Sequence, residues 1–236
     1  QLSVLFLLAA GVVGGLAGVV MSQDEEKPED IRQAPKLVDA RKFRVGQLIE
    51  DLAFTDTEGK SGKLSDYKDK KALVIAVTNS TCPICKKFAP VLNEVVSDYA
   101  EKDVAFLLLN PMENDTVDKC KDAIKRYGFT ARYISDPKGE IARALKVNST
   151  GDCFVLDSAR TLRYRGAVSD QFGFGYNLDE PRETYLRDAI DAVLEGEDVF
   201  YNATWAPGCL LEFEATEPKG DITWHNHEQL GTTDQG

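Results

Sequence analysis

An apolar stretch that leads directly into two closely spaced cysteines constrains this chain more than any other feature. Residues 72–78 form an apolar run that ends at a threonine, which predicts a buried strand. A polar turn follows, and Cys82-Pro-Ile-Cys85 then opens a segment with helical periodicity. At a helix N-terminus, free backbone N–H groups and the helix dipole stabilise a thiolate, the form of sulfur that attacks. The stretch therefore predicts thiol–disulfide exchange.

Two other uses of this cysteine spacing fit the sequence less well. A zinc site requires a second Cys/His pair at a matching spacing. Haem attachment requires a histidine directly after Cys85, where Lys86 stands. We therefore expect neither a metal nor a cofactor at the pair. A static structural bridge remains the alternative to a redox pair.

The composition limits both the compartment and the partners. The 236 residues carry a formal net charge of −11, which argues against nucleic acids and anionic membrane surfaces as partners. Five cysteines are too few for a disulfide scaffold, and their odd number leaves at least one thiol unpaired within a monomer. With 43% hydrophobic residues, we expect one domain of ordinary size with extensions.

The N-terminal segment indicates export. Residues 2–21 are apolar and uncharged and are followed by an acidic stretch, so we predict a signal peptide or a membrane anchor over residues 1–22. Residues 23–42 are charged and poor in apolar residues, which predicts a flexible linker. We therefore expect the protein to be periplasmic, or anchored in the membrane and facing the periplasm. A redox cysteine pair in that compartment would act on the disulfides and dithiols of other proteins.

The rest of the chain alternates predicted strands and helices. After the strand at 72–78 we expect a helix over 86–99, a strand at 104–110, a helix over 115–127, a short strand from 132, a short helix over 140–146, a hairpin of 153–157 with 161–166, and a helix over 181–194. This order predicts an α/β domain over 43–198 with a mixed sheet flanked by helices. We expect residues 199–236 to begin a linker to a partner domain.

The order of these elements carries a family resemblance. Gly62-Lys-Leu-Ser-Asp-Tyr, then the apolar strand, then the Cys-x-x-Cys helix resembles AhpC/TSA-type redoxins of the thioredoxin superfamily and, more loosely, TlpA-like reductases. The Gly173-Phe-Gly-Tyr-Asn and Ala206-Pro-Gly-Cys segments look like those of exported planctomycete-type redoxins. The resemblance implies a thioredoxin-like three-layer sandwich and a redox-active centre in an oxidoreductase.

The resemblance also assigns roles to individual residues. It implies that Cys82 attacks a substrate disulfide and that Cys85 resolves the mixed disulfide. The loop that binds substrate by strand pairing then consists of Thr150, Gly151 and Asp152, with Gly151 where the family usually has a cis-proline.

Two further residues near the pair are expected to stabilise the thiolate. Thr81 takes the place of the aromatic residue that usually precedes the first cysteine of thioredoxins, and Lys86 adds local positive charge. No carboxylate lies in the strand at 72–77, where thioredoxins bury a proton acceptor.

Two alternative functions remain open beside exchange. One is a peroxiredoxin-like antioxidant peroxidase, although the proline and threonine that peroxiredoxins place before the attacking cysteine are Ile75 and Asn79 here. The other is a copper-binding or chaperone role, in which the cysteine pair holds the metal.

The remaining cysteines and the histidines are expected to have plainer roles. Cys120 and Cys153 fall on apolar faces and are predicted to be buried free thiols, with exchange between Cys153 and Cys82 as the alternative. Cys209 lies outside the predicted domain and could pair with another chain or with a further part of this one. His225 and His227, the two histidines of the chain, are predicted to lie in an exposed polar tail.

Overall fold

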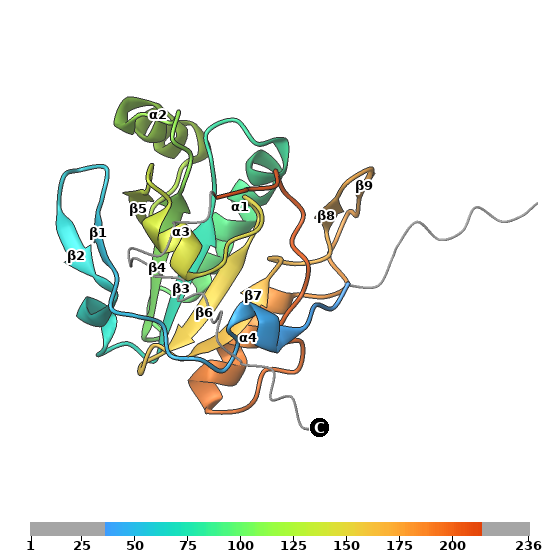
Figure 1. Cartoon of the computed structure of the whole chain (residues 1–236). Coiled ribbons are helices and arrows are strands. Elements are labelled where there is room, and N and C mark those ends of the chain that lie inside the picture. The colour runs from blue at the N-terminus through green and yellow to red at the C-terminus, as the bar shows by residue number, and fades with distance from the viewer. Residues whose placement is uncertain (1–35, 214–236) are drawn as a thin grey trace, which may run out of the picture. The chain divides into compact units, whose positions relative to one another are not determined.

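A five-stranded sheet forms the centre of the fold (Figure 1). The computed structural model describes residues 36–213, so the predicted segment 1–22 and residues 214–236 lie outside the described residues. The strand order is β5-β4-β3-β6-β7. Strand β3 pairs in parallel with β4 and antiparallel with β6, and β6 and β7 form an antiparallel hairpin. The predicted mixed sheet is confirmed.

The elements follow the predicted order along the chain. The strands are β1 (Ala53–Thr55), β2 (Ser61–Lys63), β3 (Ala72–Val77), β4 (Val104–Asn110), β5 (Arg132–Ser135), β6 (Cys153–Asp157), β7 (Leu162–Gly166), β8 (Phe172–Gly173) and β9 (Tyr176–Asn177). The helices are α1 (Pro83–Asp98), α2 (Val117–Tyr127), α3 (Glu140–Ala144) and α4 (Tyr185–Glu195), with 3-10 turns η1 (Ala40–Phe43) and η2 (Leu64–Tyr67). None of the helices between residues 36 and 213 is long and apolar enough to cross a membrane.

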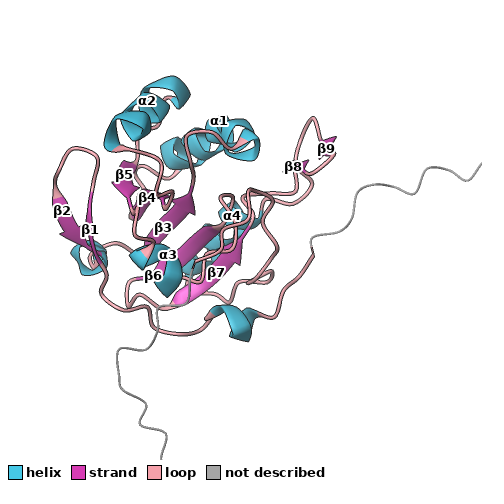
Figure 2. Cartoon of the chain, turned by 45° about the horizontal axis from the view of Figure 1, so that its top comes forward, coloured by secondary structure: helices cyan, strands magenta, loops and turns pink. Residues whose placement is uncertain are grey.

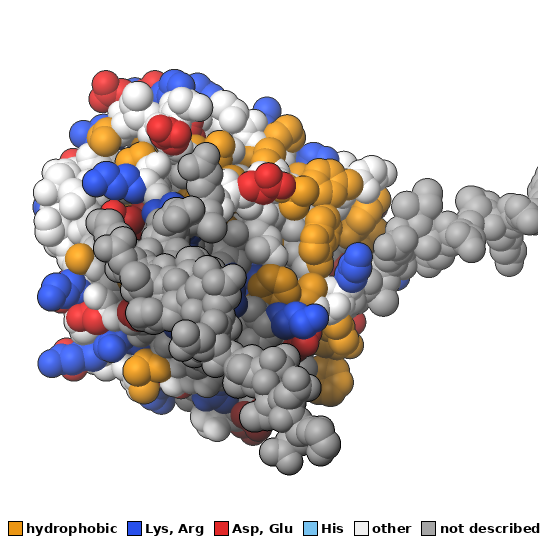
Figure 3. Space-filling view, viewed as in Figure 1, with side chains coloured by type: hydrophobic (Ala, Val, Ile, Leu, Met, Phe, Trp, Pro, Cys, Tyr) orange, Lys and Arg blue, Asp and Glu red, His pale blue; other side chains and the backbone are white. Residues whose placement is uncertain are grey.

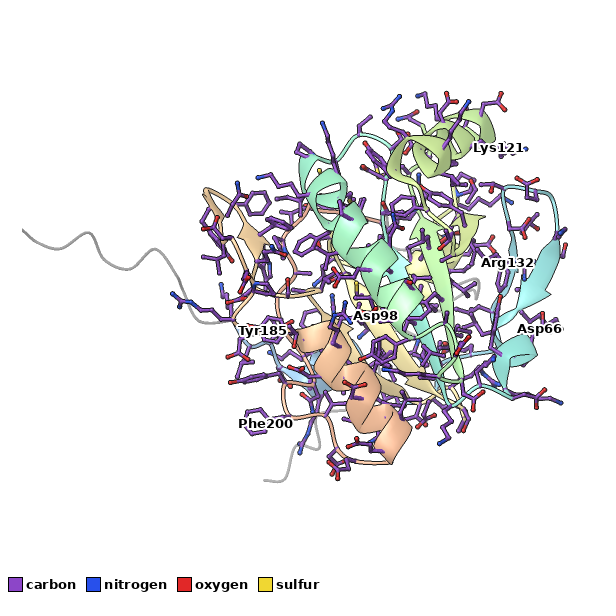
Figure 4. The ribbon with its side chains drawn as sticks, turned by 180° about the vertical axis from the view of Figure 1, so that it is seen from behind. Asp66, Asp98, Lys121, Arg132, Tyr185 and Phe200 are labelled. Atoms are coloured by element: carbon purple, nitrogen blue, oxygen red, sulfur yellow. The ribbon has the colours of Figure 1, made fainter. Side chains whose placement is uncertain are left out.

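Helices cover both faces of the sheet, which gives the expected three layers (Figure 2). Alternate residues of the fully buried strand β3 point to opposite faces. Ala72, Val74 and Ala76 pack in one core with apolar side chains of α1 and α4, and Leu73, Ile75 and Val77 pack in a second core with α3 and the N-terminal strands. The view from behind shows α1 and α4 crossing the same face, where Arg187 of α4 binds Asp98 at 2.6 Å (Figure 4).

The starts of two helices differ from the prediction for local reasons. Helix α4 starts at Tyr185 instead of residue 181, because the Asp170 carboxylate accepts hydrogen bonds from the backbone N–H groups of Arg182 and Glu183 and holds them in a loop. Helix α2 starts at Val117, because the Thr116 hydroxyl caps it by accepting from a backbone N–H of the first turn. Helix α2 ends at Tyr127, as predicted, and Gly128 is its C-cap.

Both flanks of the predicted domain are folded onto it. Residues 40–42, which were expected in the linker, belong to η1, and Leu37 forms a β-bridge with Thr204. Beyond residue 198, Ala203 pairs with Arg165 of β7, and both Ala203 and Thr204 are buried. The folded region therefore extends past the expected bounds of 43 and 198, and it brings the segment 205–211 to the cysteine pair.

Candidate active site

The turn between β3 and α1 places the cysteine pair. The side-chain oxygen of Asn79 accepts hydrogen bonds from the backbone N–H groups of Thr81 and Cys82, which closes the turn. Cys82 then serves as the N-cap residue of α1, and its sulfur accepts from the N–H of Cys85 at 3.4 Å. Pro83 occupies the first helical turn, where its missing N–H costs nothing. The predicted position at a helix N-terminus is confirmed.

A buried polar network supports this turn from behind. The Asp115 carboxylate accepts from the hydroxyl of Ser80 at 2.7 Å, from its N–H at 2.9 Å, and from the Asn110 amide at 2.9 Å. Burial opposes ionisation of Asp115, but the hydrogen bonds from Asn110 and Ser80 outweigh it and hold the pKa of the carboxyl below its ordinary value. Asp115 therefore fixes the turn as a charged acceptor.

Thr150, in the loop before β6, contacts both cysteines. Its hydroxyl donates to the Cys82 sulfur at 3.1 Å, and its carbonyl accepts from the Cys85 thiol at 3.2 Å. Both cysteines are almost completely buried, with Cys82 2% and Cys85 5% exposed. The predicted substrate loop thus lies against the pair, and Thr150 is the member that contacts the sulfur atoms.

The surroundings shift the two thiols in opposite directions. The adjacent Cys85 thiol lowers the pKa of Cys82 most, and the Thr150 hydroxyl and the N–H groups of Cys85 and Cys209 add to this against the effect of burial. The neighbouring Cys82 and burial raise the pKa of Cys85 well above its ordinary value. These shifts favour a thiolate on Cys82 and a thiol on Cys85.

The other two loop residues shape the loop. Asp152 is buried and binds Arg165 of β7 at 2.6 Å, and the same carboxylate accepts from the backbone N–H groups of Asn148 and Ser149. Gly151 lies against the backbone of Pro207, whose carbonyl oxygen is 1.9 Å from the place a Cβ at residue 151 would take. The glycine in the usual position of proline thus makes room for another part of this chain.

Cys209 belongs to the site, although the sequence placed it outside the domain. Its N–H donates to the Thr150 hydroxyl at 3.0 Å, and its carbonyl accepts from the Thr150 N–H at 3.0 Å. Burial, and then the neighbouring Cys82, raise the pKa of its thiol. The one sequence signal for this contact was Gly151, which marks a close approach of a second backbone.

Thr81 and Lys86 act through their backbones in the structure. Thr81 donates its N–H to the Asn79 side chain, and Lys86 donates its N–H to the Cys82 carbonyl. Both side chains are exposed. The groups that lower the pKa of Cys82 come instead from Cys85, Thr150 and Cys209.

The two remaining cysteines are buried free thiols, as predicted. Burial raises the pKa of Cys120 and of Cys153, so both stay protonated. Within residues 36–213, no group of three or more His, Cys, Asp or Glu side chains could hold a metal ion. His225 and His227 lie outside the described residues.

Known proteins share the sequence pattern and the fold. Residues 45–165 match the model of the AhpC/TSA family. The thiol-disulfide oxidoreductase ResA of Bacillus thuringiensis subsp. konkukian (strain 97-27) is 29% identical over 116 residues, which cover 49% of this chain and 65% of the relative. The chain thus spans less than two thirds of that relative's length.

Solved structures extend the likeness over more of the chain. A hypothetical protein, SMc02350 from Sinorhizobium meliloti 1021, has a TM-score of 0.65 and 28% identity and covers 72% of this chain and 95% of its own. A candidate thiol:disulfide interchange protein DsbE from Chlorobium tepidum has a TM-score of 0.53 and 19% identity, and the match covers 64% of this chain and 97% of that protein. At this level of identity the likeness shows a shared fold and no more. Since the family model matches slightly more than half of the 236 residues, this chain belongs to the AhpC/TSA family and has the thioredoxin fold.

Proposed function

We propose that this protein is a thiol–disulfide oxidoreductase in which Cys82 attacks and Cys85 resolves. The observation that carries the proposal is that the surroundings lower the pKa of one cysteine and raise that of the other. Cys82 accepts hydrogen bonds at a helix N-terminus and is held as a thiolate, while Cys85 beside it is held as a thiol. An exchange enzyme needs one group ready to attack and a second that reacts only after the first has been consumed.

The exchange would proceed in two balanced steps. The Cys82 thiolate attacks one sulfur of a substrate disulfide, forms a mixed disulfide and releases the other sulfur as a thiolate, which takes up a proton. Cys85 then loses its proton and attacks the Cys82 sulfur, so that a Cys82–Cys85 disulfide forms and the second substrate thiol leaves. The substrate gains two electrons, which the cysteine pair loses, and the reverse sequence oxidises a dithiol.

The surface around the pair suits extended protein substrates. Figure 3 shows apolar side chains gathered over the β8–β9 hairpin. Phe174 of that hairpin is 61% exposed, and its ring lies 5.8 Å from the ring of Trp205. Phe172 anchors the hairpin on Phe88 of α1 at 5.1 Å. An exposed apolar surface beside a redox pair favours contact with an unfolded or flexible segment of another protein.

The same proposal includes the compartment. The apolar run over residues 2–21 supports export to the periplasm, either after removal of a signal peptide or with the run retained as an anchor. An oxidising compartment supplies the disulfides on which such an enzyme acts.

The test is a redox titration of the full chain against glutathione, with disulfides mapped at each potential. We expect a reversible two-electron transition of the Cys82–Cys85 pair between roughly −270 and −120 mV, the range of exchange catalysts. Cys82→Ser should abolish the transition and the reduction of a model protein disulfide, whereas Cys120→Ser should retain both. A bridge that resists reduction below about −300 mV would instead identify a static disulfide. Consumption of peroxide without disulfide reduction would favour the peroxidase alternative.

A further inference from the structure

We propose that Cys209 is a third exchange cysteine, which resolves mixed disulfides at Cys82 by forming a Cys82–Cys209 disulfide within the chain. The inference rests on the proposed function, because it requires that Cys82 attack a disulfide. Cys209 lies 124 positions along the chain from Cys85. It reaches the cysteine pair through the folded C-terminal segment (Figure 1).

The segment that carries Cys209 binds the substrate loop as a strand would. Ser149 and Leu210 form an antiparallel β-bridge, and the N–H of Leu211 donates to the carbonyl of Asn148 at 2.9 Å. The N–H of Thr150 donates to the carbonyl of Cys209 at 3.0 Å. Main-chain pairing of this kind is how an extended peptide is held at a free strand edge. Residues 209–211 thus pair with the loop that the sequence predicts to bind substrate, and this pairing holds the backbone of Cys209 against Thr150.

Two glycines allow this close approach. A Cβ at Gly151 would lie 1.9 Å from the carbonyl oxygen of Pro207, and a Cβ at Gly208 would lie 2.6 Å from the Gly151 nitrogen and 2.9 Å from the Thr150 hydroxyl. Real side chains do not tolerate these separations, so any larger residue at either position would push the two backbones apart. The contact between loop and segment therefore depends on glycine on both sides.

The charge of Cys82 affects how readily Cys209 loses its proton. While Cys82 is a thiolate, burial and then the contact with Cys82 and its negative charge raise the pKa of Cys209. Once Cys82 enters a mixed disulfide, its charge is gone, and Cys209 can lose its proton more easily.

The resolving step balances without a further reactant. Cys209 passes its proton to the departing substrate thiolate, and its sulfur attacks the Cys82 sulfur. The Cys82–substrate bond breaks as the Cys82–Cys209 bond forms. Cys85 can then attack Cys82 in turn, which releases Cys209 as a thiol and leaves the Cys82–Cys85 disulfide. Each transfer requires the two sulfurs to reach the bonding distance and geometry of a disulfide.

The test uses the full chain with Cys85→Ser, so that a Cys82 mixed disulfide cannot be resolved by Cys85. The reduced protein receives one equivalent of the chromogenic disulfide dithiobis(nitrobenzoate). Trypsin would release Cys82 on peptide 72–86 and Cys209 on peptide 188–219, separate from Cys120 and Cys153. We expect both halves of the reagent to be released and peptides 72–86 and 188–219 to be linked. The second release should be first order and independent of protein concentration.

The other outcomes separate the two proposals. If one half of the reagent stays on peptide 72–86, Cys82 has attacked the reagent, as the proposed function requires, but Cys209 has not resolved the mixed disulfide. That result overturns the role of Cys209 and leaves the proposed function standing. If peptide 72–86 is never modified or linked, the proposed function fails and the inference fails with it. The matched control, Cys85→Ser with Cys209→Ser, should retain the reagent on Cys82.

A variant that changes no cysteine tests the geometry. Gly151→Ala in the Cys85→Ser chain should push the segment away from the loop and slow the second release by about tenfold or more relative to the first, since an intramolecular reaction depends steeply on the placement of the reacting atoms. A second release at the unaltered rate would show that the pairing does not position Cys209, and would overturn the inference. A thermal unfolding curve measured beside it identifies a variant that has merely lost its fold.

Discussion

Replacement of Thr150 by valine should raise the pKa of Cys82 and slow its attack on disulfides. The substitution removes the hydroxyl that donates to the Cys82 sulfur at 3.1 Å and accepts from the N–H of Cys209 at 3.0 Å. Valine keeps the volume, the backbone N–H, and the carbonyl that binds the Cys85 thiol at 3.2 Å. The change therefore isolates the hydroxyl.

The size of the shift follows from the strength of that bond. A hydrogen bond to a charged group contributes about 1.5–3 kcal/mol. One pKa unit corresponds to about 1.36 kcal/mol. If the full bond is lost, the pKa of Cys82 rises by about 1–2 units. Because the Cys85 thiol is the strongest of the groups that lower the pKa of Cys82, the sulfur should still titrate below an ordinary thiol.

The assay is the pH dependence of the ultraviolet absorbance of the thiolate, checked by the rate of alkylation with iodoacetamide. Thr150→Ser keeps a hydroxyl and is the matched control, with a titration close to that of the unaltered protein. If Thr150→Val and Thr150→Ser titrate at the same pH, the Thr150 hydroxyl does not stabilise the thiolate, which would refute the role of this hydrogen bond.

Three further predictions concern stability. The reduced protein should lose stability relative to Cys82→Ser as the pH falls below about 8.5, by up to about 1.4 kcal/mol per pH unit. The reason is that the pKa of Cys82 is lowered in the folded state, so the unfolded chain binds more protons in this pH range. Urea unfolding of both proteins at several pH values measures the effect, and free energies of unfolding that change in parallel would refute it. Asp152→Asn should lower the free energy of unfolding in urea by about 3–5 kcal/mol, because it leaves Arg165 buried without its partner. Asp198→Asn removes the carboxylate of an exposed ion pair and should change the free energy of unfolding little, so similar losses in the two variants would contradict the prediction. Asn79→Ala should cost about 1–3 kcal/mol by leaving the N–H of Cys82 unpaired, and an unchanged unfolding midpoint would show that water replaces the amide.

Local patterns in the sequence determined the frame of the site. The buried strand β3 and the periodicity of α1 follow from neighbouring residues, and Cys82 at the helix N-terminus follows from both. The spacing of Cys82 and Cys85 and their chemistry are properties of four consecutive residues. The mixed sheet was predictable as well, because alternating strands and helices closed by a hairpin leave few arrangements.

Only the tertiary structure decided which groups complete the site. Thr150 lies 68 residues from Cys82, and Cys209 lies a further 59 residues on, so no local pattern brings them together. Their positions depend on the Asp152–Arg165 ion pair and on the close backbone contact at Gly151, both of which are contacts between distant parts of the chain. Thr81 and Lys86 were predicted to stabilise the thiolate, yet both side chains are exposed. The groups that lower the pKa of Cys82 belong to Cys85, Thr150 and Cys209, and the last two reach the sulfur only through the tertiary fold. Sequence proximity therefore predicted the nucleophile, and long-range packing determined what surrounds it.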